Sequence, residues 1–452
     1  MSMKFGTDGI RGLANKELTA KLAFEVGQAG ALVLAKKTTA RPRILVAQDT
    51  RLSSDMLVAA LTAGLCSVGA DVINLGVLPT PAIAALVNRY NAHAGVMMSA
   101  SHNPFYDNGI KFFDGNGYKL PDHIEDEIEA QILKLDDLDL PSGADVGRML
   151  PAPDALPCYV DFLKKCVNST DLSGLTIALD CANGATYQAA PLVFEGLGAK
   201  VLLIGNNPDG ININDKCGST YMNTIAEFVR QNKVDAGFAF DGDGDRCLAV
   251  DENGNVLDGD MIMSIIAMHM KSKGKLAHNT VVATVMSNLG LFAAAKEHGL
   301  TVEQTKVGDR YVMERMKEGG FTLGGEQSGH IILLNHQTTG DGILASLALA
   351  TIVATTGKAL SILNTVMTKM PQTLKNAKIP NDKKDMVLSN PQVAAEIGNA
   401  HTKFEGRGRV LIRPSGTEPL IRVMIEGSNL AEIEAEATRL ADLLEQATRG
   451  GT

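Results

Sequence analysis

Three aspartates alternate with glycines in the stretch FDGDGDR, at Asp241, Asp243 and Asp245. Carboxylates this close together repel one another unless a cation lies among them. Carboxylate oxygens are ligands that Mg²⁺ and Ca²⁺ prefer, so the pattern indicates a divalent-cation site. A calcium-binding EF-hand is an alternative because Glu252 falls at the twelfth position, but the sixth position holds Arg246, where an EF-hand needs glycine. The apolar runs AGFAF and CLAV on either side instead predict a loop between two strands.

A serine that could act as a nucleophile lies in the stretch MMSASHNPF. The preceding HAGVMM predicts a buried strand, so Ser101 would lie just past its carboxyl end, where ligands bind in open α/β sheets. A hydrolase would need the pattern G-x-S-x-G, which this stretch lacks. His102 is a candidate catalytic residue by position, but it is a poor base for Ser101 because neighbouring side chains diverge in an extended chain. A phosphate carrier fits better, since the chain also offers a metal loop and basic residues.

Two polar loops offer groups suited to phosphate and sugar. RPSGTEP combines an arginine fork, two hydroxyls and a glycine that lets backbone N–H groups approach an anion, at Arg413, Ser415, Thr417 and Gly416. GGEQSGH presents short polar side chains, Glu326 and Ser328, that suit hydrogen bonds to sugar hydroxyls. A histidine such as His330 is, taken alone, more often structural than catalytic.

Three basic residues complete the set of candidates. Lys111 lies within the apolar, strand-like run DNGIKFF. It either extends to the surface or is desolvated, which would lower its pKa and make it a candidate acid or base. Arg11 lies beside glycine in GTDGIRG and can reach into a cleft, and Arg310 lies on a strand-to-helix loop in VGDRYV.

The elements that must position these residues repeat three times along the chain. Each repeat has a short β-branched run, a polar loop, an apolar helical stretch, a glycine and a second strand, starting at RILVAQD, LTIALDCANG and NTVVATVMSNLG. This βαβ signature predicts three similar α/β domains with mixed, mostly parallel sheets. The C-terminal stretch instead predicts two antiparallel strands and an amphipathic helix, which is a smaller α+β domain. We place the four domains at 1–150, 151–255, 256–370 and 371–452.

Length and composition limit the class of protein. A chain of 452 residues suits several domains, and its net charge of −9 argues against nucleic-acid binding by a broad basic surface. The six cysteines are scattered without a CxxC pair, which is typical of reduced thiols. The N-terminus lacks a signal-like apolar segment, and no apolar run reaches the roughly 18–20 residues that a membrane span needs. We therefore expect a soluble, cytoplasmic protein with neither a nucleic-acid nor a membrane partner.

Taken together, GTDGIRG, SASHNPFYDNGIKFF, DGDGDR, GGEQSGH and RPSGTEP resemble the α-D-phosphohexomutase family, in its order and over essentially the whole chain. The resemblance implies that Ser101 carries a phosphoryl group as phosphoserine. A phosphate oxygen on that serine would complete a site for one Mg²⁺ per subunit, with the three aspartates as the other ligands. Lys111 would be the general acid and base, with His330 the weaker candidate, and Arg11 and Arg246 would steady the transferring phosphoryl group.

The resemblance also assigns residues to the substrate. The phosphate that is not reacting would be held by Arg413, Ser415, Gly416 and Thr417, with Arg422. Glu326 and Ser328 would contact sugar hydroxyls, and Arg246 and Arg310 belong to the same substrate-binding set. The first and fourth motifs are most similar to family members that act on an amino sugar. The implied reaction interconverts glucosamine 6-phosphate and glucosamine 1-phosphate through glucosamine 1,6-bisphosphate, which is also an activator, and feeds UDP-N-acetylglucosamine synthesis.

Three alternatives stay open at this stage. A phosphomannomutase/phosphoglucomutase would use the same residues on another sugar. A metal-dependent phosphatase could also form a phosphoserine, but it would have to admit water and would have little need for four domains around a central cleft. A non-enzymatic Ca²⁺-binding module is disfavoured by the incomplete EF-hand pattern. The sequence leaves a homodimer open.

Overall fold

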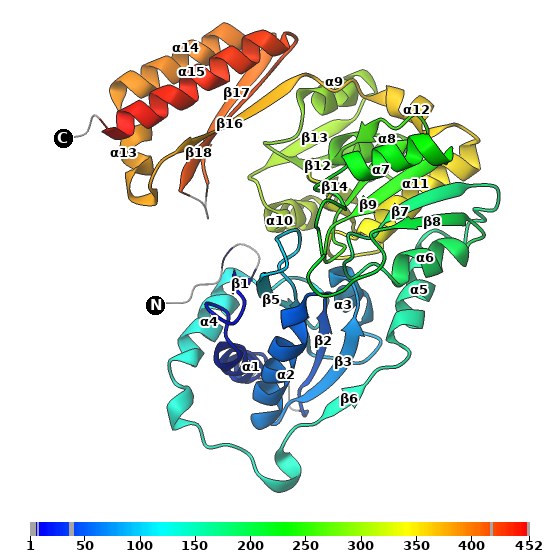
Figure 1. The fold of residues 1–452 in the computed structure, drawn as a ribbon, viewed down its shortest axis with the longest axis vertical. Coiled ribbons are helices and arrows are strands. Elements are labelled where there is room, and N and C mark those ends of the chain that lie inside the picture. The colour runs from blue at the N-terminus through cyan, green and yellow to red at the C-terminus, as the bar shows by residue number, and fades with distance from the viewer. Residues whose placement is uncertain (1–5, 7–8, 36–39, 416–418, 450–452) are drawn as a thin grey trace. The chain divides into compact units, whose positions relative to one another are not determined.

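The computed structural model of the chain describes residues 6, 9–35, 40–415 and 419–449 (Figure 1). The described residues form four β-sheets with helices packed on them. The chain divides into two compact units, one made of Met1–Met286 with Gly299–Val366 and the other of Ser287–His298 with Met367–Thr452.

Three of the sheets share one strand order, which confirms the repeated βαβ pattern. In each, the first strand lies between a second and a third strand that run parallel to it, and a fourth strand pairs antiparallel with the third. In the spatial order second, first, third and fourth, these strands are β3 (Asp71–Val77), β2 (Arg43–Gln48), β4 (Ala94–Met98) and β5 (Asp107–Asp114) in the first sheet, β8 (Lys200–Ile204), β7 (Thr176–Asp180), β9 (Ala236–Phe240) and β10 (Cys247–Asp251) in the second, and β13 (Thr301–Thr305), β12 (Thr280–Thr284), β14 (Leu323–Gly325) and β15 (Ile331–Leu333) in the third. The helices that connect first to second strands are α2 (Leu52–Ser67), α6 (Ala189–Glu195) and α9 (Leu289–Glu297).

Additional strands extend two of these sheets. In the first, β1 (Ile10–Leu13) pairs antiparallel with β5, and β6 (Met149–Pro151) pairs parallel with β3. In the second, β11 (Val256–Leu257) pairs antiparallel with β10. Because β6 and β11 lie at the proposed boundaries near 150 and 255, those boundaries stay predictions.

Helices with apolar faces cover the three sheets of the first unit. They are α1 (Ala20–Ala35), α3 (Thr80–Leu86), α4 (Asp122–Ile132), α5 (Ala155–Cys166), α7 (Asn223–Asn232), α8 (Gly259–Ser272), α10 (Asp309–Gly319), α11 (Gly342–Thr356) and α12 (Leu360–Leu363), with 3₁₀ turns η1 (Leu135–Asp137), η2 (Gly143–Asp145), η3 (Ala277–Asn279) and η4 (Asn364–Val366). Helices α1 and α2 pack closely because glycine allows it: a Cβ on Gly64 would lie 2.0 Å from the carbonyl oxygen of Phe24.

The C-terminal unit has a three-stranded antiparallel sheet with β18 (Leu420–Gly427) between β16 (Gln372–Lys378) and β17 (Gly408–Pro414). Its own helices are α13 (Lys384–Leu388), α14 (Pro391–Phe404) and α15 (Leu430–Arg449), with the 3₁₀ turn η5 (Asn381–Lys383). Ile433, Leu440 and Leu444 recur at helical spacing on α15 and are buried in one core with β18. The predicted α/β class with a smaller C-terminal α+β part is thereby confirmed.

Helix α9 belongs by its contacts to the C-terminal unit, although it connects two strands of the third sheet. The backbone N–H of Leu289 donates to Glu426 at 3.2 Å, and Arg409 donates to the carbonyl of Ser287 at 2.7 Å. Arg409 also pairs with the buried Glu426 at 2.6 Å. A charge pair at the start of α9 therefore ties this helix to β17 and β18.

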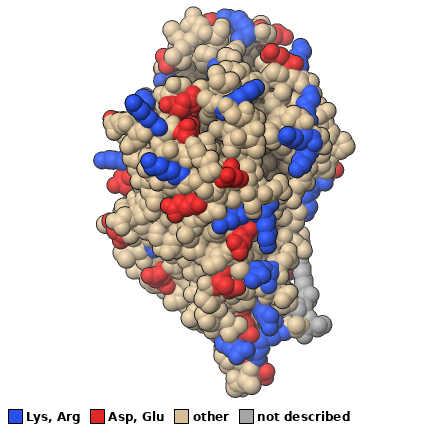
Figure 2. All heavy atoms as spheres, turned by 90° about the vertical axis from the view of Figure 1, so that its right-hand side faces the viewer, with Lys and Arg blue, Asp and Glu red and all other residues tan. Residues whose placement is uncertain are grey.

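The surface and the helix lengths bear on the class of protein. Basic and acidic side chains are interspersed over the face shown in Figure 2. No single helix among the described residues is long and apolar enough to cross a membrane. The stretches Gly342–Thr356 and Leu360–Val366 reach that length and composition only when joined, and they are bent by 100° at the break.

Candidate active site

The three α/β sheets place their polar loops at equivalent positions, between the third strand and the antiparallel fourth strand. In the first sheet the β4–β5 loop carries Ser101, and in the second the β9–β10 loop carries Asp241 to Asp245. In the third, the β14–β15 loop carries Glu326 to His330. Three motifs that look unrelated in the sequence thus occupy one structural position, at the carboxyl end of a strand parallel to its sheet's first strand.

Ser101 is buried and has a left-handed backbone, with φ of 52°. A non-glycine residue seldom adopts this conformation, and when it does the site is often functional. The Ser101 hydroxyl donates to Asp241 Oδ2 at 2.6 Å, and its backbone N–H donates to Ser99 Oγ at 2.9 Å. The strained turn therefore directs the hydroxyl from the first sheet toward the acidic loop of the second.

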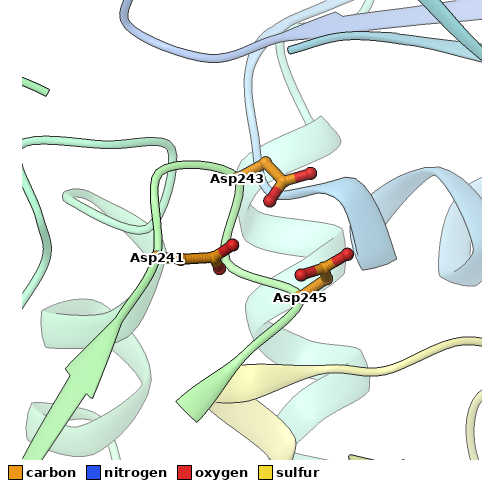
Figure 3. A group of neighbouring side chains, drawn as sticks. All are labelled: Asp241, Asp243 and Asp245. Carbon is orange, nitrogen blue, oxygen red and sulfur yellow. The ribbon is translucent and has the colours of Figure 1, made fainter. Parts of the chain in front are cut away.

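The carboxylates of Asp241, Asp243 and Asp245 point toward one another from the β9–β10 loop (Figure 3). All three are buried, and one oxygen from each lies within 4.8 Å of the others. Burial, together with the charges of Asp243 and Asp245, raises the pKa of Asp241 well above its ordinary value. Asp245 Oδ1 is buried and has no hydrogen-bond partner among the described residues. A divalent cation fits this donor set, because it would satisfy that oxygen and offset the repulsion.

His102 lies nearer to Ser101 than an extended chain would allow. Its Nδ1 is 3.3 Å from Ser101 Oγ, because the left-handed conformation of Ser101 brings neighbouring side chains together. The expectation that the two side chains diverge was therefore wrong. Burial and the positive charges of Arg246 and Arg11 lower the pKa of His102 to about 4. The serine proton is nevertheless directed at Asp241, at the shorter distance of 2.6 Å.

Lys111 is buried beside the metal loop. Its Nζ donates to Asp243 Oδ2 at 2.8 Å, and the Thr80 hydroxyl donates to the same oxygen at 2.6 Å. Of the two alternatives for this lysine, the desolvated one is correct. Thr80, at the start of α3, was missed in the sequence because a hydroxyl after a proline turn is a common helix start.

Arg246 links the three loops at the site. Its backbone N–H donates to Asp241 Oδ1 at 3.2 Å, and its Nη1 lies 3.3 Å from His102 Nδ1. The Glu326 carboxylate acts on it from the third sheet and, with the aspartates, raises the pKa of the arginine against the lowering effect of burial. Arg11, on β1, contributes positive charge at His102.

His330 is buried between two carboxylates. Its Nδ1 is 3.6 Å from Asp245 and its Nε2 is 3.6 Å from Asp309. Burial lowers the pKa of His330, but the carboxylates raise it overall. The backbone N–H of Gly340 donates to Nε2 at 3.0 Å, which opposes protonation there and assigns the proton to Nδ1. We follow the backbone contact and regard His330 as a neutral residue that orients Asp245.

Two predicted substrate residues lie away from Ser101. Arg310 contacts the Leu120 carbonyl and Asp122 and lies 3.3 Å from Glu125, so its guanidinium reaches the start of α4. Ser328 is exposed on the β14–β15 loop. Their assignment to the substrate stays a prediction.

The predicted phosphate loop lies in the C-terminal unit. Arg413 and Arg422 are register partners on β17 and β18, which places two guanidinium side chains on one face of the sheet. Ser415 is buried, and its carbonyl accepts a hydrogen bond of 2.6 Å from Lys384, which the sequence did not single out. Gly416 and Thr417 lie outside the described residues.

Arg51, Asp49 and Asn214 also contact the Ser101 loop or its supports, and none was found in the sequence. Asp49 and Arg51 pair at 2.8 Å just past the end of β2. The available signal was their position at the carboxyl end of a predicted parallel strand, the edge that also carries Ser101. Asn214 donates to the Ser101 carbonyl at 3.0 Å from a loop that offers no such signal.

Models of the four domains of one family match successive parts of the chain. Their descriptions are phosphoglucomutase/phosphomannomutase alpha/beta/alpha domains I, II and III and C-terminal domain, matching residues 2–139, 157–254, 258–370 and 374–443. Two similar proteins are the phosphoglucosamine mutases of Ruminiclostridium cellulolyticum and Acetivibrio thermocellus. They are 55% and 54% identical to the chain, over 98% and 99% of it and 99% of each relative.

Solved structures agree at the level of the fold. A phosphoglucomutase/phosphomannomutase family protein of Burkholderia thailandensis has a TM-score of 0.79 at 23% identity, covering 99% of this chain and 98% of that one. The N-acetylphosphoglucosamine mutase of Aspergillus fumigatus, solved with GlcNAc-6P and magnesium, has a TM-score of 0.71 at 19% identity, covering 99% and 96%. With its shared loop positions, acidic cluster and full-length relatives, the chain belongs to the phosphoglucomutase/phosphomannomutase family.

Proposed function

We propose that this protein is a mutase that interconverts glucosamine 6-phosphate and glucosamine 1-phosphate. The observation that carries the proposal is the hydrogen bond of 2.6 Å between the Ser101 hydroxyl and Asp241, at the edge of a buried cluster of three carboxylates. The choice of the amino sugar rests on the relatives of 54–55% identity, which are phosphoglucosamine mutases. The product would feed UDP-N-acetylglucosamine synthesis in the cytoplasm.

Ser101 would carry the phosphoryl group between the two ends of the sugar. In the first step the P–O bond at Ser101 Oγ breaks, and a new P–O bond forms at the free sugar hydroxyl, giving glucosamine 1,6-bisphosphate. The hydroxyl proton is taken up by Ser101 Oγ, with Lys111 Nζ as the relaying group. The second step is the reverse with the other phosphate, so atoms and charge balance over the cycle.

The other residues would bind and orient. Asp241, Asp243 and Asp245 would hold Mg²⁺, which when bound neutralises charge on the phosphoryl oxygens. Arg246 and Arg11 contribute positive charge near His102, the residue after Ser101, and are suited to the transferring phosphoryl group.

The sugar and its second phosphate would be held by other loops. Glu326 and Ser328 are proposed to contact the sugar hydroxyls. Arg413 and Arg422, with Ser415, Gly416 and Thr417, are proposed to hold the phosphate that is not reacting. That a bisphosphate must turn end for end accounts for a phosphate loop separate from the serine loop.

The test compares the 6-phosphates of glucosamine, glucose and mannose as substrates for purified protein with Mg²⁺, each with Ser101→Ala alongside. We expect glucosamine 1-phosphate as the preferred product and loss of activity in Ser101→Ala. Preference for mannose or glucose would replace the proposed substrate by that of a phosphomannomutase/phosphoglucomutase. Release of free phosphate without isomerisation would indicate a phosphatase, and full activity in Ser101→Ala would overturn the mechanism.

A further inference from the structure

Two carbonyl groups in the Ser101 loop each accept hydrogen bonds from the same pair of side chains. Arg51 Nη2 donates to the carbonyls of Ser101 and Asn103, both at 2.9 Å. Asn214 Nδ2 donates to the same two carbonyls at 3.0 and 3.1 Å. We call these four hydrogen bonds the carbonyl clamp. Its two donors come from different sheets, since Arg51 follows β2 and Asn214 follows β8.

On the side of the first sheet, a buried network holds the clamp. Arg51 is fully buried and pairs with Asp49 at 2.8 Å. Asp49 also accepts hydrogen bonds from Ser54 at 3.0 Å and from Ser99 at 2.5 Å. Ser99 in turn accepts the backbone N–H of Ser101 at 2.9 Å. The peptide groups on both sides of Ser101 are therefore fixed from one arginine–aspartate pair.

On the side of the second sheet, the clamp packs against the metal loop. Asn214 has a left-handed backbone, with φ of 60°, and its N–H donates to the carbonyl of Ala182 at 2.9 Å. A Cβ on Gly242 would lie 2.5 Å from the Ser101 carbonyl oxygen and 2.8 Å from Asn214 Nδ2. Gly242 follows Asp241, so the clamp fixes the serine loop directly against the loop that carries the acidic cluster.

We propose that Arg51 and Asn214 are positioning residues for phosphoryl transfer, which hold Ser101 in its left-handed conformation so that Oγ faces the acidic cluster. The inference rests on the proposed function of Ser101. A serine favours φ below zero, so its observed conformation persists only if surrounding contacts hold it. Rotation of the Ser101–His102 peptide toward an ordinary conformation would break the clamp and swing Oγ away from Asp241. Neither positioning residue needs to touch substrate.

The test replaces Asn214 by glycine, which tolerates the left-handed backbone while removing the amide. Asn168→Gly is the matched control, since Asn168 also has φ of 52° but is exposed and outside the site. We expect Asn214→Gly to lower kcat by roughly 10- to 100-fold, the scale of a small misplacement of reacting groups. The KM for glucosamine 6-phosphate should stay within about twofold, because substrate contacts remain. The Tm should match that of the control.

Two more variants guard against a purely structural effect. Asn214→Asp keeps the shape and the tolerance for a left-handed backbone, but it sets carboxylate oxygens against the two carbonyls. We expect it to lose more kcat than Asn214→Gly. Arg51→Lys keeps the charge but offers one ammonium group where the guanidinium donates to several oxygens, so kcat should fall here as well.

Crystal structures of the wild type and Asn214→Gly provide a readout that does not depend on activity. We expect the contact of 2.6 Å between Ser101 Oγ and Asp241 to be lost in the variant. A kcat equal to that of Asn168→Gly, or an unmoved Ser101, would overturn the clamp. If the wild type is inactive on all three phosphosugars, the proposed function fails, and the crystal structures still decide whether Asn214 positions Ser101.

Discussion

At the scale of single residues, the acidic cluster is arranged for a ligand and against stability. Asp241, Asp243 and Asp245 are buried together, and desolvation and mutual repulsion both disfavour three ionised carboxylates. Lys111 offsets one charge at Asp243, but Asp245 Oδ1 has no hydrogen-bond partner among the described residues. Such an arrangement is expected where a bound cation supplies the missing interaction.

The first prediction follows from this imbalance and concerns Asp245→Asn. In a chelator, we expect the variant to be more stable than the wild type by about 1–2 kcal/mol, because one of three repelling charges is removed. With Mg²⁺ the order should reverse, since a ligand at 100 times its Kd stabilises the wild type by about 2.7 kcal/mol. Unfolding by denaturant in EDTA and in Mg²⁺ measures both effects.

The control for Asp245→Asn is Asp161→Asn, which removes one negative charge from an exposed position of α5. This control should respond to Mg²⁺ as the wild type does. An Asp245→Asn variant that is destabilised in EDTA, or stabilised by Mg²⁺ as much as the wild type, would show that the cluster does not bind the cation through Asp245.

How far the sequence predicts the site depends on how local its contacts are. The acidic cluster is contiguous, so spacing alone reveals it. The contacts of Ser101 with Arg51 and Asn214 join residues 50 and 113 positions apart, and no local pattern marks them. The contact between Ser101 and His102 was mispredicted because it depends on one left-handed φ angle, which the residue type serine does not suggest.

At the scale of elements, hydrophobic periodicity was sufficient to predict the strands and the crossover helices. It could not show that the loops of Ser101, Asp241 and Glu326 are equivalent, because that follows from strand pairing. Likewise, α9 reads as part of the third α/β repeat, whereas the buried pair of Arg409 and Glu426 ties it to the C-terminal sheet. Pairing and long-range charge contacts are tertiary properties that periodicity does not encode.

Asp341 is a second buried carboxylate with a role between elements. It caps α11, where Oδ1 accepts the backbone N–H of Leu344 at 2.9 Å, and its Oδ2 accepts the hydroxyl of Tyr159 on α5 at 2.9 Å. Burial raises its pKa to about 6, although these donors lower it. Because it is protonated more readily in the folded protein than in the unfolded chain, Asp341 makes stability depend on pH.

The second prediction is the direction of that dependence. The pKa of Asp341 rises on folding from 3.8 to about 6, so its contribution is most favourable below pH 4 and is lost as the pH rises through 6. Asp341→Asn keeps a capping oxygen but cannot ionise. We expect the stability of the wild type relative to the variant to fall by about 2–3 kcal/mol between pH 4 and pH 7.

Denaturant unfolding of both proteins at several pH values measures this difference. Taking the difference removes the contributions of other titrating groups, such as Glu252, whose pKa is lowered and whose effect has the opposite sign. A difference that stays constant from pH 4 to pH 7, or that grows with pH, would show that Asp341 is not protonated preferentially in the folded state.

At the scale of the whole molecule, the first unit is held together by polar contacts between its first and third sheets. Lys119 pairs with Asp309, and the Thr338 hydroxyl donates to the carbonyl of Gly117 at 2.6 Å. Arg310, the predicted substrate residue, contributes to the same contact surface through Glu125 at 3.3 Å. The sequence predicted the separate α/β repeats, but it gave no indication of which side chains join them.

The third prediction separates the two roles open to Arg310. If the arginine mainly joins α10 to α4, then Arg310→Gln and Glu125→Gln should lower stability by similar amounts, about 1–3 kcal/mol for a mostly buried pair. Both variants should then keep the KM for glucosamine 6-phosphate within about twofold, because neither removes a substrate contact. Denaturant unfolding and steady-state kinetics on the same preparations give both quantities. The double variant should be little worse than either single one, since the two residues share one interaction. A KM raised tenfold or more in Arg310→Gln alone, with Glu125→Gln unchanged, would instead assign Arg310 to the substrate, as the sequence predicted.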